Sequence, residues 1–398
     1  MRLSIPPPLA LYVHLPWCVR KCPYCDFNSH AVGHGAFPEG AYVAALIKDL
    51  RFTAPGIDGR PIRSIFFGGG TPSLFSGTSL GVLMEAIAEN LKLDDDIEIT
   101  LEANPGTIEA HHFREYRQHG VNRLSIGVQS LDDRSLQQIG RIHTAAEAVA
   151  AVHTARAAGF ENINVDLMYG LPGQDAAMAL TDLSRATALP VNHVSWYQLT
   201  LEPNTVFYHA PPPLPDEDSI RTMEQGGHAL LEGLGFARYE VSAFARPDRR
   251  SRHNLNYWEF GDYLAIGAGA HDKVTDVTAN TISRSIRHRL PARFMELAGG
   301  AGAIVQARDL NPGDRVLEFM LNALRLTGGF SQAVFTERTG LPVAAIAAPV
   351  DHCVRKGWLE IGPDRVTPTA TGMLYLNEVL ERFLPDDDAA VADRLPAG

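Results

Sequence analysis

This sequence contains little cysteine: four residues in a chain of 398. So few cysteines do not form the disulfide framework of a secreted domain, and they favour a reducing compartment. The sequence also lacks any run of about 18 apolar residues, so we expect no transmembrane segment. Its N-terminus has neither the apolar stretch nor the small-residue cleavage site of a signal peptide. We therefore expect a cytoplasmic protein.

Basic residues are also in deficit. The chain has 35 Lys and Arg against 46 Asp and Glu, which gives a net charge of −11. A broad nucleic-acid-binding face usually needs excess positive charge, so nucleic acid is not an expected partner. The composition is otherwise that of a globular protein, with 45% hydrophobic residues, and the length allows a large core and two domains.

Short β-rich runs alternate with helix-like segments in the first half of the chain. The expected strands are residues 9–14, 64–67, 97–101, 123–128, 162–168 and 194–199. The expected helices are residues 38–53, 78–92, 107–119, 144–158 and 175–188. Parallel strands need crossover connections of this kind, so the pattern predicts an α/β fold with a parallel sheet. Each unusual motif follows a strand, and we therefore expect these motifs to meet at the carboxyl edge of the sheet.

The pattern changes twice in the second half of the chain. A proline-rich stretch, residues 211–215, ends the alternation, and a helix is expected over residues 219–231. After a turn near residues 310–313, short helices and a hairpin-like end resemble a small winged-helix unit. We accordingly divide the chain into a first domain, residues 1–300, and a C-terminal domain, residues 301–398.

Three of the four cysteines form the motif C-x3-C-x2-C after the first strand: Cys18, Cys22 and Cys25. Three thiolates can hold three irons of a [4Fe–4S] cluster and leave the fourth iron open to another ligand. Two alternatives stay open at this point. Cys22 and Cys25 have the C-x-x-C spacing of a redox dithiol, and a structural zinc ion could recruit His14 or Asp26 as its fourth ligand.

Other strand ends carry glycine or polar side chains. The run Gly68-Gly69-Gly70-Thr71-Pro72 would let a ligand approach the backbone and leave N–H groups pointing outward, although such runs also serve as simple tight turns. Glu102, Gln129, Arg141 and Asp166 follow or end later strands. Each also suits a surface or capping position, but together they could meet the amine, carboxylate and hydroxyls of a zwitterionic nucleoside.

The segment His253-Asn254-Leu255-Asn256-Tyr257-Trp258 gathers an imidazole, amides, a phenol and an indole. Neutral histidine is a good haem-iron ligand, and aromatic faces pack on flat macrocycles. The alternative is a packed loop without a ligand. His271 is an isolated candidate of the same kind, whereas Cys353 lies in an expected helix and is interpreted as a small core residue.

The order C-x3-C-x2-C then G-G-G-T-P resembles the radical S-adenosylmethionine (SAM) superfamily. The segments E-A-N-P at 102–105, G-V-Q-S at 127–130, G-R-I-H at 140–143 and D-L-M-Y-G-L-P at 166–172 look like the oxygen-independent coproporphyrinogen III oxidase family, over nearly the whole chain. The oxidases of that family carry a further cysteine two residues after the third, where this chain has Phe27. Phe27 and the motif at residues 253–258 are similar to the HemW-type haem chaperone branch.

This resemblance implies a partial (β/α)6 radical SAM barrel with a small, mostly helical, winged-helix-like C-terminal domain. It implies that Cys18, Cys22 and Cys25 bind a [4Fe–4S] cluster whose open iron takes SAM. The residues that would hold SAM are Tyr12, Gly69, Gly70, Thr71, Glu102, Gln129, Arg141 and Asp166. The residues that would contact haem are His253, Asn254, Tyr257 and Trp258.

The implied function is a cytoplasmic haem chaperone that binds haem and transfers it to an acceptor protein, with an electron donor as a further partner. The alternative is an oxygen-independent coproporphyrinogen III oxidase, which decarboxylates two propionates by radical chemistry. The resemblance favours a chaperone over a coproporphyrinogen dehydrogenase, and it assigns no catalytic residue.

Overall fold

The computed structural model describes residues 2–32, 37–57, 59–106 and 112–385. Within these residues twelve strands form one sheet, in the order β14-β13-β12-β11-β1-β4-β5-β6-β7-β8-β10-β9. The parallel part consists of β11 (Asp262–Ile266), β1 (Leu9–Leu15), β4 (Ile62–Gly69), β5 (Leu93–Ala103), β6 (Arg123–Gln129), β7 (Asn162–Tyr169) and β8 (His193–Gln198). The six strands expected from the sequence, and their parallel arrangement, are confirmed. Strand β11 adds a parallel neighbour to β1.

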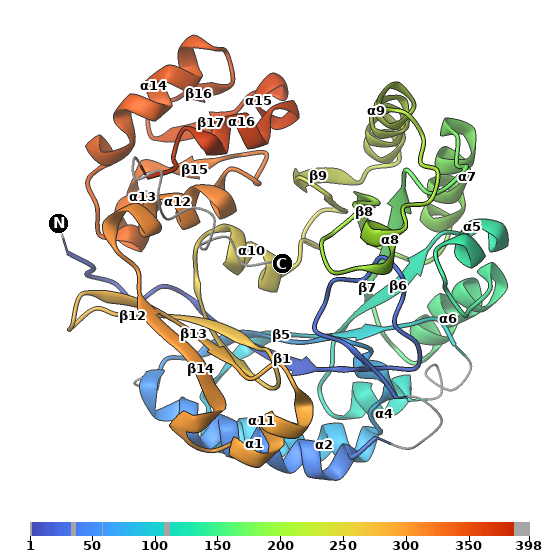
Figure 1. Cartoon of the computed structure of the whole chain (residues 1–398), viewed down its shortest axis with the longest axis horizontal. Coiled ribbons are helices and arrows are strands. Elements are labelled where there is room, and N and C mark those ends of the chain that lie inside the picture. The colour runs from blue at the N-terminus through green and yellow to red at the C-terminus, as the bar shows by residue number, and fades with distance from the viewer. Residues whose placement is uncertain (1, 33–36, 58, 107–111, 386–398) are drawn as a thin grey trace.

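Antiparallel strands extend the sheet at both edges. Beside β8 lie β10 (Ala243–Ala245) and β9 (Ala237–Glu240). Beside β11 lie β12 (His271–Asp276), β13 (Thr281–Arg287) and β14 (Ile304–Asp309). The strands curve into an open barrel (Figure 1). A partial barrel is thereby confirmed, and its edges are longer than the sequence indicated.

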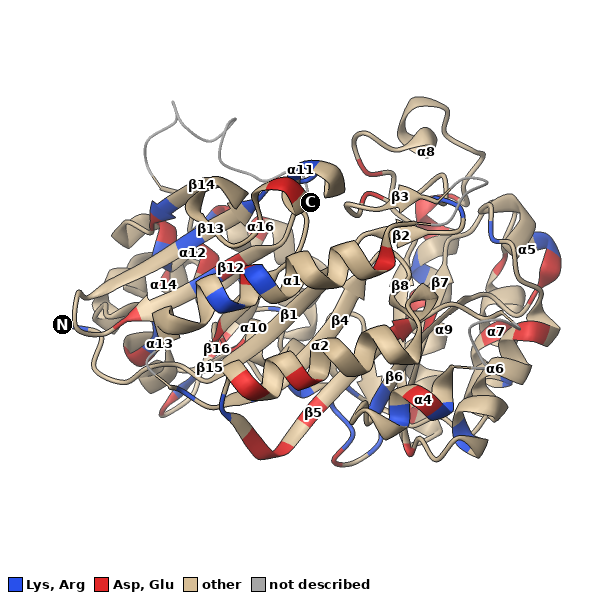
Figure 2. Ribbon diagram, turned by 90° about the horizontal axis from the view of Figure 1, so that it is seen from below, with Lys and Arg blue, Asp and Glu red and all other residues tan. Residues whose placement is uncertain are grey.

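Helices cover the outer face of the parallel strands. They are α1 (Glu39–Thr53), α2 (Gly77–Asn90), α4 (Phe113–Gln118), α5 (Asp133–Gln138), α6 (Ala145–Ala157), α7 (Ala176–Thr187) and α9 (Glu217–Gly233). Helices α1 and α2 lie side by side against β1 and β4 (Figure 2). Thr144 and Glu147 form a capping box at the start of α6, and this local signal explains why its start was predictable. Residues 107–111 of the predicted helix 107–119 lie outside the described residues.

The C-terminal part of the chain forms a smaller unit with its own core (Figure 1). It contains α12 (Pro312–Ala323), β15 (Phe330–Ser331), α13 (Gln332–Thr339), α14 (Ala347–Arg355), β16 (Leu359–Ile361), β17 (Arg365–Pro368), α15 (Ala370–Leu374) and α16 (Leu376–Glu381). Cys353 is fully buried in this core, as predicted. The division at residue 300 stays a prediction, and β14, beyond it, still pairs with β13 in the large sheet.

Buried ion pairs fasten the antiparallel strands to the parallel barrel. The ammonium group of Lys273 on β12 lies 2.8 Å from Asp262 on β11, and both side chains are buried. Arg287 on β13 contacts Asp49 of α1 at 3.3 Å and Asp272 of β12 at 2.5 Å. Such groups remain charged inside a protein only when they are paired, so these contacts determine how β12 and β13 dock.

None of the helices in the described parts of the chain combines the length and apolar character that crossing a membrane requires.

Candidate functional site

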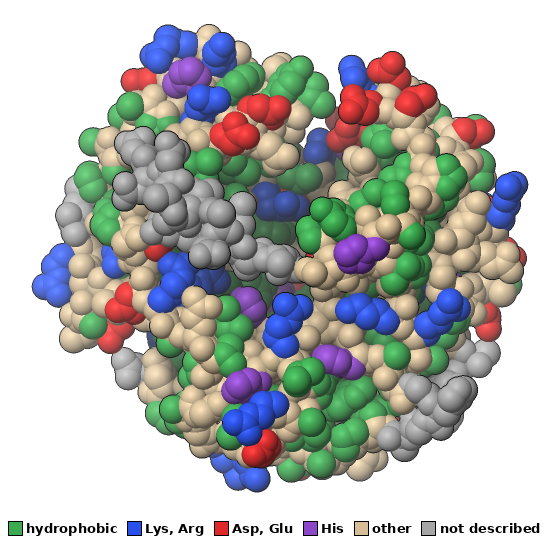
Figure 3. All heavy atoms as spheres, in the orientation of Figure 1, with side chains coloured by type: hydrophobic (Ala, Val, Ile, Leu, Met, Phe, Trp, Pro, Cys, Tyr) green, Lys and Arg blue, Asp and Glu red, His purple; other side chains and the backbone are tan. Residues whose placement is uncertain are grey.

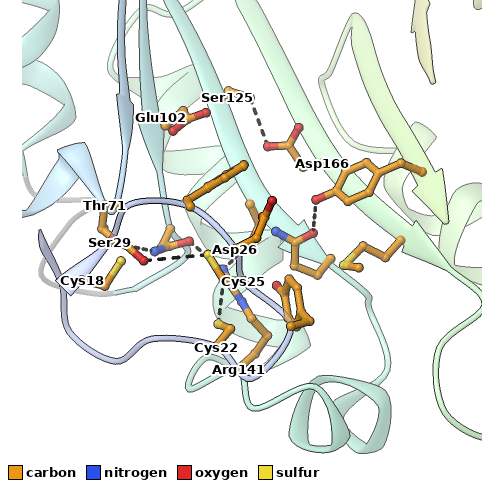
Figure 4. A pocket seen from close by; sticks show the side chains of 18 of the residues that line it. Cys18, Cys22, Cys25, Asp26, Ser29, Thr71, Glu102, Ser125, Arg141 and Asp166 are labelled. Carbon is orange, nitrogen blue, oxygen red and sulfur yellow. Dashed lines mark hydrogen bonds between the residues drawn. The ribbon is translucent and has the colours of Figure 1, made fainter. Parts of the chain in front are cut away.

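A cavity of about 430 Å³ lies at the carboxyl edge of the parallel strands. The cysteine loop forms one wall, and the ends of β5 to β8 form the other (Figure 4). The predicted site residues that line it are Cys18, Cys22, Cys25, Gly70, Thr71, Glu102, Gln129, Arg141 and Asp166. Segments more than a hundred residues apart in sequence therefore converge, as parallel strands predict. The other two predicted residues, Tyr12 and Gly69, do not line the cavity and lie behind the residues that do.

The cysteine loop has a defined shape. Its two ends pair as short parallel strands, β2 (Trp17–Cys18) and β3 (His30–Ala31). Inside the loop, the N–H of Cys25 donates to the carbonyl of Cys22 at 3.1 Å. The carbonyl of Pro23 accepts from the N–H of Phe207 at 3.0 Å, which holds the loop against α8 (Val206–His209). The thiols are thus presented by an ordered backbone.

The three thiols fit an iron–sulfur cluster. They are spread along the wall of one cavity, and a cluster needs this arrangement because each thiolate binds a separate iron. Among the described residues no group of three or more His, Cys, Asp or Glu lies in a ready-made arrangement around a metal ion, so the thiols would close on iron when it binds. Burial raises the pKa of the Cys18 and Cys25 thiols, so their thiolates need the compensating charge that bound iron supplies.

His14, the histidine considered as a zinc ligand, is engaged by the protein. Its Nε2 atom lies 2.9 Å from the carbonyl oxygen of Asn28, so Nε2 carries the proton and donates. The Nδ1 atom therefore accepts from the Tyr12 hydroxyl at 3.1 Å. Burial lowers the pKa of His14 to about 4, and the ring is neutral. Both nitrogens have partners, so His14 is not presented to a metal in this conformation.

The glycine turn after β4 docks against the cysteine loop. The N–H of Gly70 donates to the carbonyl of Leu15 at 2.8 Å, and the N–H of Thr71 donates to that of Trp17 at 2.7 Å. A Cβ on Gly70 would lie 2.6 Å from the Trp17 carbonyl oxygen, so only glycine fits there. The expectation that these N–H groups point outward to a ligand was wrong: the protein uses them itself. The glycines make close approach to the cysteine loop possible.

Two carboxylic acids face the cavity from neighbouring parts of the sheet. Burial and the nearby charge of Asp166 raise the pKa of Glu102 to about 8. Glu102 Oε2 accepts from the N–H of Gly69 at 3.2 Å. Burial also raises the pKa of Asp166, although its oxygens accept from Ser125 at 3.1 Å and Asn164 at 2.9 Å. A ligand that brings positive charge or hydroxyl donors would stabilise the ionised form of both acids.

Arg141 joins the two walls of the cavity. Its Nη2 atom donates to Oδ1 of Asn104 and to the carbonyl of Gly127, both at 2.6 Å. Its Nη1 atom lies 3.7 Å from the sulfur of Cys22. Within the described part of the chain its buried Nε–H has no hydrogen-bond partner. The guanidinium therefore places a permanent positive charge beside the thiols and keeps one donor available.

Sequence reasoning missed several cavity residues, among them Asn104, Ser125 and Tyr197. Asn104 belongs to the E-A-N-P motif, and its amide nitrogen donates to the Thr71 hydroxyl at 2.7 Å. Ser125 precedes Gly127 and Gln129 at the alternate spacing of a strand, which was an available signal. Tyr197 donates to Gln129 at 2.9 Å, a contact between distant strands that no local pattern encodes.

The predicted haem residues lie elsewhere, on α10 (Arg252–Trp258). This helix contacts β1, β4 and α12, and therefore lies between the barrel and the C-terminal unit (Figure 1). In the same orientation the molecular surface is hollowed at its centre (Figure 3). The four residues His253, Asn254, Tyr257 and Trp258 do not line the cavity of the cysteines.

His253 is buried, with 2% of its surface exposed. Its ring stacks on Phe66 with centroids 4.9 Å apart, and its Nδ1 atom lies 3.0 Å from the hydroxyl of Ser64. Its Nε2 atom is buried and has no hydrogen-bond partner among the residues that the structure describes. Burial lowers the pKa of His253 to about 3, so the imidazole is neutral. Neutral imidazole with an unused nitrogen suits metal ligation, provided that α10 moves to expose it.

At the other end of α10, the ring of Trp258 packs against the guanidinium of Arg325, whose carbon lies 4.4 Å from the ring centroid. Arg325 also contacts Glu240 of β9 at 3.0 Å. The indole N–H of Trp258 is buried, and no described residue accepts a hydrogen bond from it. This end of α10 thus joins the sheet edge to the C-terminal unit. The isolated candidate His271 lies at the exposed start of β12.

Comparisons with known proteins agree with this architecture. Residues 12–184 match the model of the Radical SAM superfamily, and residues 310–375 match that of the HemN C-terminal domain. The solved structure of coproporphyrinogen III oxidase (HemN) from Escherichia coli is similar with a TM-score of 0.80 and 23% identity, covering 95% of this chain and 90% of that one. At this identity the likeness concerns the fold.

The barrel, the three-cysteine loop and the shared cavity define a radical SAM protein. This class implies a [4Fe–4S] cluster and SAM as cofactors. Two curated relatives are named "Heme chaperone HemW": one from Haemophilus influenzae is 44% identical and one from Escherichia coli 45% identical. Each alignment covers 96% of this chain and 99% of the relative. The chain belongs to the HemW family.

Proposed function

We propose that this protein binds haem and transfers it to an acceptor protein, and that it carries a [4Fe–4S] cluster with SAM on the open iron. The observation that carries the proposal is the 44–45% identity, over nearly the full length of both chains, to relatives named as heme chaperones. The 23% identity to the oxidase HemN supports only a common fold. The position of Phe27, exposed at the mouth of the cysteine cavity, separates this chain from the oxidase pattern.

The cluster and SAM are assigned to the cysteine cavity. Cys18, Cys22 and Cys25 would bind three irons, and the cavity of about 430 Å³ behind them has space for a small nucleoside. Glu102 and Asp166 suit the cationic and hydroxyl groups of SAM, and Arg141 suits its carboxylate. Gly70, Thr71 and Gln129 complete the lining, whereas Tyr12 and Gly69 support it from behind.

When bound, a reduced cluster of this kind can supply one electron to the sulfonium of SAM. The chain's own residues have defined tasks around it. Arg141 places positive charge 3.7 Å from the Cys22 sulfur and ties the cysteine loop to the ends of β5 and β6. Glu102 stores a proton near neutral pH and releases it when a cation approaches, since its pKa is about 8. Tyr197 orients the Gln129 side chain through its 2.9 Å hydrogen bond.

Haem is assigned to α10 and the hollow beside it. His253 offers a neutral imidazole with an unpaired nitrogen, and Tyr257 and Trp258 supply aromatic surface on the same short helix. Because His253 is 2% exposed, ligation by its Nε2 atom requires a displacement of α10. Such a displacement also provides a means of release to an acceptor. The three free thiols and the need for an electron donor fit the reducing cytoplasm.

The test is haem titration of the anaerobically reconstituted protein, followed by transfer to an apo-acceptor. We expect a Soret band that saturates at one haem per chain and a shifted band with at least tenfold weaker binding for His253→Ala. His153→Ala is the matched control, because that histidine is exposed on α6, on the outer face of the barrel. Unchanged haem affinity and spectrum in His253→Ala would remove this histidine from the site.

The oxidase alternative has its own assay. Reconstituted protein is supplied with coproporphyrinogen III, SAM and a reductant, and products are separated by chromatography. The chaperone proposal predicts no decarboxylated product above the level of a Cys22→Ala control. Robust formation of protoporphyrinogen IX would overturn it.

A further inference from the structure

A continuous series of buried hydrogen bonds leads from the cofactor cavity into the barrel. It starts at Asp166, which lines the cavity and accepts from the hydroxyl of Ser125 and the amide nitrogen of Asn164. Asn164 also donates to Ser125 at 2.7 Å, so its amide nitrogen is fully used. The remaining Oδ1 atom of Asn164 lies 2.6 Å from Nδ1 of His193. Because that oxygen can only accept, the Nδ1 atom of His193 carries the proton.

The series then passes from His193 to α10. The Nε2 atom of His193, left without a proton, accepts from the hydroxyl of Tyr239 at 2.8 Å. The hydroxyl oxygen of Tyr239 accepts in turn from the N–H of Ser251 at 3.4 Å. Ser251 is the N-cap residue of α10. Every hydrogen bond along this path is therefore donated in the direction of Asp166. A carboxylate at one end favours this direction, because its oxygens accept hydrogen bonds.

The middle of the path is sealed from solvent. Asn164, His193 and Tyr239 are 1%, 0% and 2% exposed. Water cannot replace a partner at these positions, and an unsatisfied buried polar group is unfavourable. Ser195 also donates to the Oδ1 atom of Asn164 at 3.2 Å, as a branch beside the path, and a change in the hydrogen bonds at one end still alters the partners available to the next member. The hydrogen bonds of the path are therefore expected to rearrange together.

The first turn of α10 has other attachments, among them two contacts of the Arg252 guanidinium with Asp96, one to the carbonyl oxygen at 2.5 Å and one to the carboxylate at 2.7 Å. The carboxylate of Glu98 accepts from the N–H groups of Arg252 and His253, each at 3.1 Å. The ring of His253 contacts Ser64 and Phe66. The Tyr239 hydroxyl is the contact through which the buried path reaches Ser251 at the start of the helix.

We propose that this path couples the cofactor cavity to α10, with His193 and Tyr239 as positioning residues. A ligand that donates to Asp166 competes with Ser125 and Asn164 for its oxygens, and the readjustment passes through His193 and Tyr239 to Ser251. SAM in the cavity thereby changes the mobility of the first turn of α10. The consequence for haem rests on the proposed function, whereas the coupling itself does not. Coupling between two sites is reciprocal, with typical effects of about five- to 150-fold on affinity.

Hydrogen exchange tests the coupling without haem. The full-length protein, with its cluster reconstituted anaerobically, is compared with and without SAM, and exchange is followed in the peptide that contains residues 251–258. We expect SAM to change the exchange rate there by about fivefold or more in the wild type, in line with a modest coupling energy. In Tyr239→Phe, which keeps the ring and removes the hydroxyl, we expect no response. His193→Gln serves as the second variant and should behave in the same way.

The matched control is Tyr116→Phe, which also removes a buried hydroxyl. That hydroxyl donates to the carbonyl of Phe75 at 2.6 Å, outside the path. This variant should keep the wild-type response. The proposal is overturned if wild type and Tyr239→Phe respond alike to SAM, or if SAM leaves the exchange of residues 251–258 unchanged in the wild type.

Haem titrations extend the test and separate the two proposals. The ratio of haem dissociation constants with and without SAM should depart from one by at least about fivefold in the wild type and return to one in Tyr239→Phe. Each variant is first checked for wild-type iron content and SAM affinity. A wild-type protein that shows the exchange response but binds no haem refutes the proposed function and supports the coupling.

Discussion

The guanidinium of Arg141 lies 3.7 Å from the sulfur of Cys22, while its other nitrogen donates to Asn104 and Gly127 at 2.6 Å. One side chain from the loop between α5 and α6 therefore joins the cysteine loop to the ends of β5 and β6. The position of the thiols relative to the carboxylic acids depends on this contact.

Arg141→Gln should weaken SAM binding more than it weakens the fold. It removes hydrogen bonds of a charged donor, each worth about 1.5–3 kcal/mol, which corresponds to about ten- to 100-fold in affinity. Equilibrium dialysis of SAM against reconstituted protein measures this change. Arg134→Gln, on the exposed surface of α5, is the control and should bind SAM normally. A wild-type affinity in Arg141→Gln contradicts the assigned role.

The number of cysteine ligands can be tested by metal analysis. We expect about four irons and negligible zinc per wild-type chain, because three thiolates on a shared cavity suit a cube with one open corner. Cys18→Ala, Cys22→Ala and Cys25→Ala should each lose most of the iron. Cys353→Ala should keep all of it and lose only about 1 kcal/mol of stability, since Cys353 is a buried core residue. Zinc at one equivalent, with no iron, would support the zinc alternative.

SAM affinity should rise with pH up to about 8 and then level off. Below that pH the Glu102 carboxyl is protonated, because burial and Asp166 raise its pKa to about 8. A cationic ligand favours the carboxylate, so binding at lower pH must release a proton. Calorimetry in buffers of different ionisation enthalpy measures that proton. Glu102→Gln should release fewer protons, and the ligand's own titration, common to both proteins, cancels in the comparison.

The buried pair Asp262–Lys273 should be essential for stability. Asp262→Asn leaves the buried ammonium of Lys273 uncompensated, and we expect a loss of about 3–5 kcal/mol in urea unfolding. Asp94→Asn removes an exposed contact with Arg63 at 3.9 Å and should cost less than about 1 kcal/mol. Equal effects of the two substitutions would contradict this account.

The same pair predicts a pH dependence. Burial alone would raise the pKa of Asp262, but Lys273 and Arg60 hold it below its usual value. A carboxyl whose folded pKa is depressed stabilises the fold above its unfolded pKa, and that contribution is lost as the pH falls. The difference in unfolding free energy between wild type and Asp262→Asn should therefore shrink below about pH 4.

Local sequence patterns were sufficient to predict the parallel barrel and the position of the cysteine loop. Alternating apolar runs and capped helices encode βα units, and the carboxyl edge of parallel strands is a single place, so Glu102, Asp166 and the cysteines were expected to meet. The antiparallel additions escaped prediction because β9, β10 and β12 are short and their pairing depends on distant partners such as Asp262.

The sequence by itself determined which chemistry is available here: three clustered thiols, two acids at strand ends, and a histidine with aromatic neighbours. Only the tertiary structure decided how these groups are separated. It turned the amides of Gly70 and Thr71 inward, and it placed His253 on the inner face of the barrel, away from the thiols. The physical reason is burial, because a polar group inside the barrel takes its partner from whichever strand lies opposite, however distant that strand is in sequence.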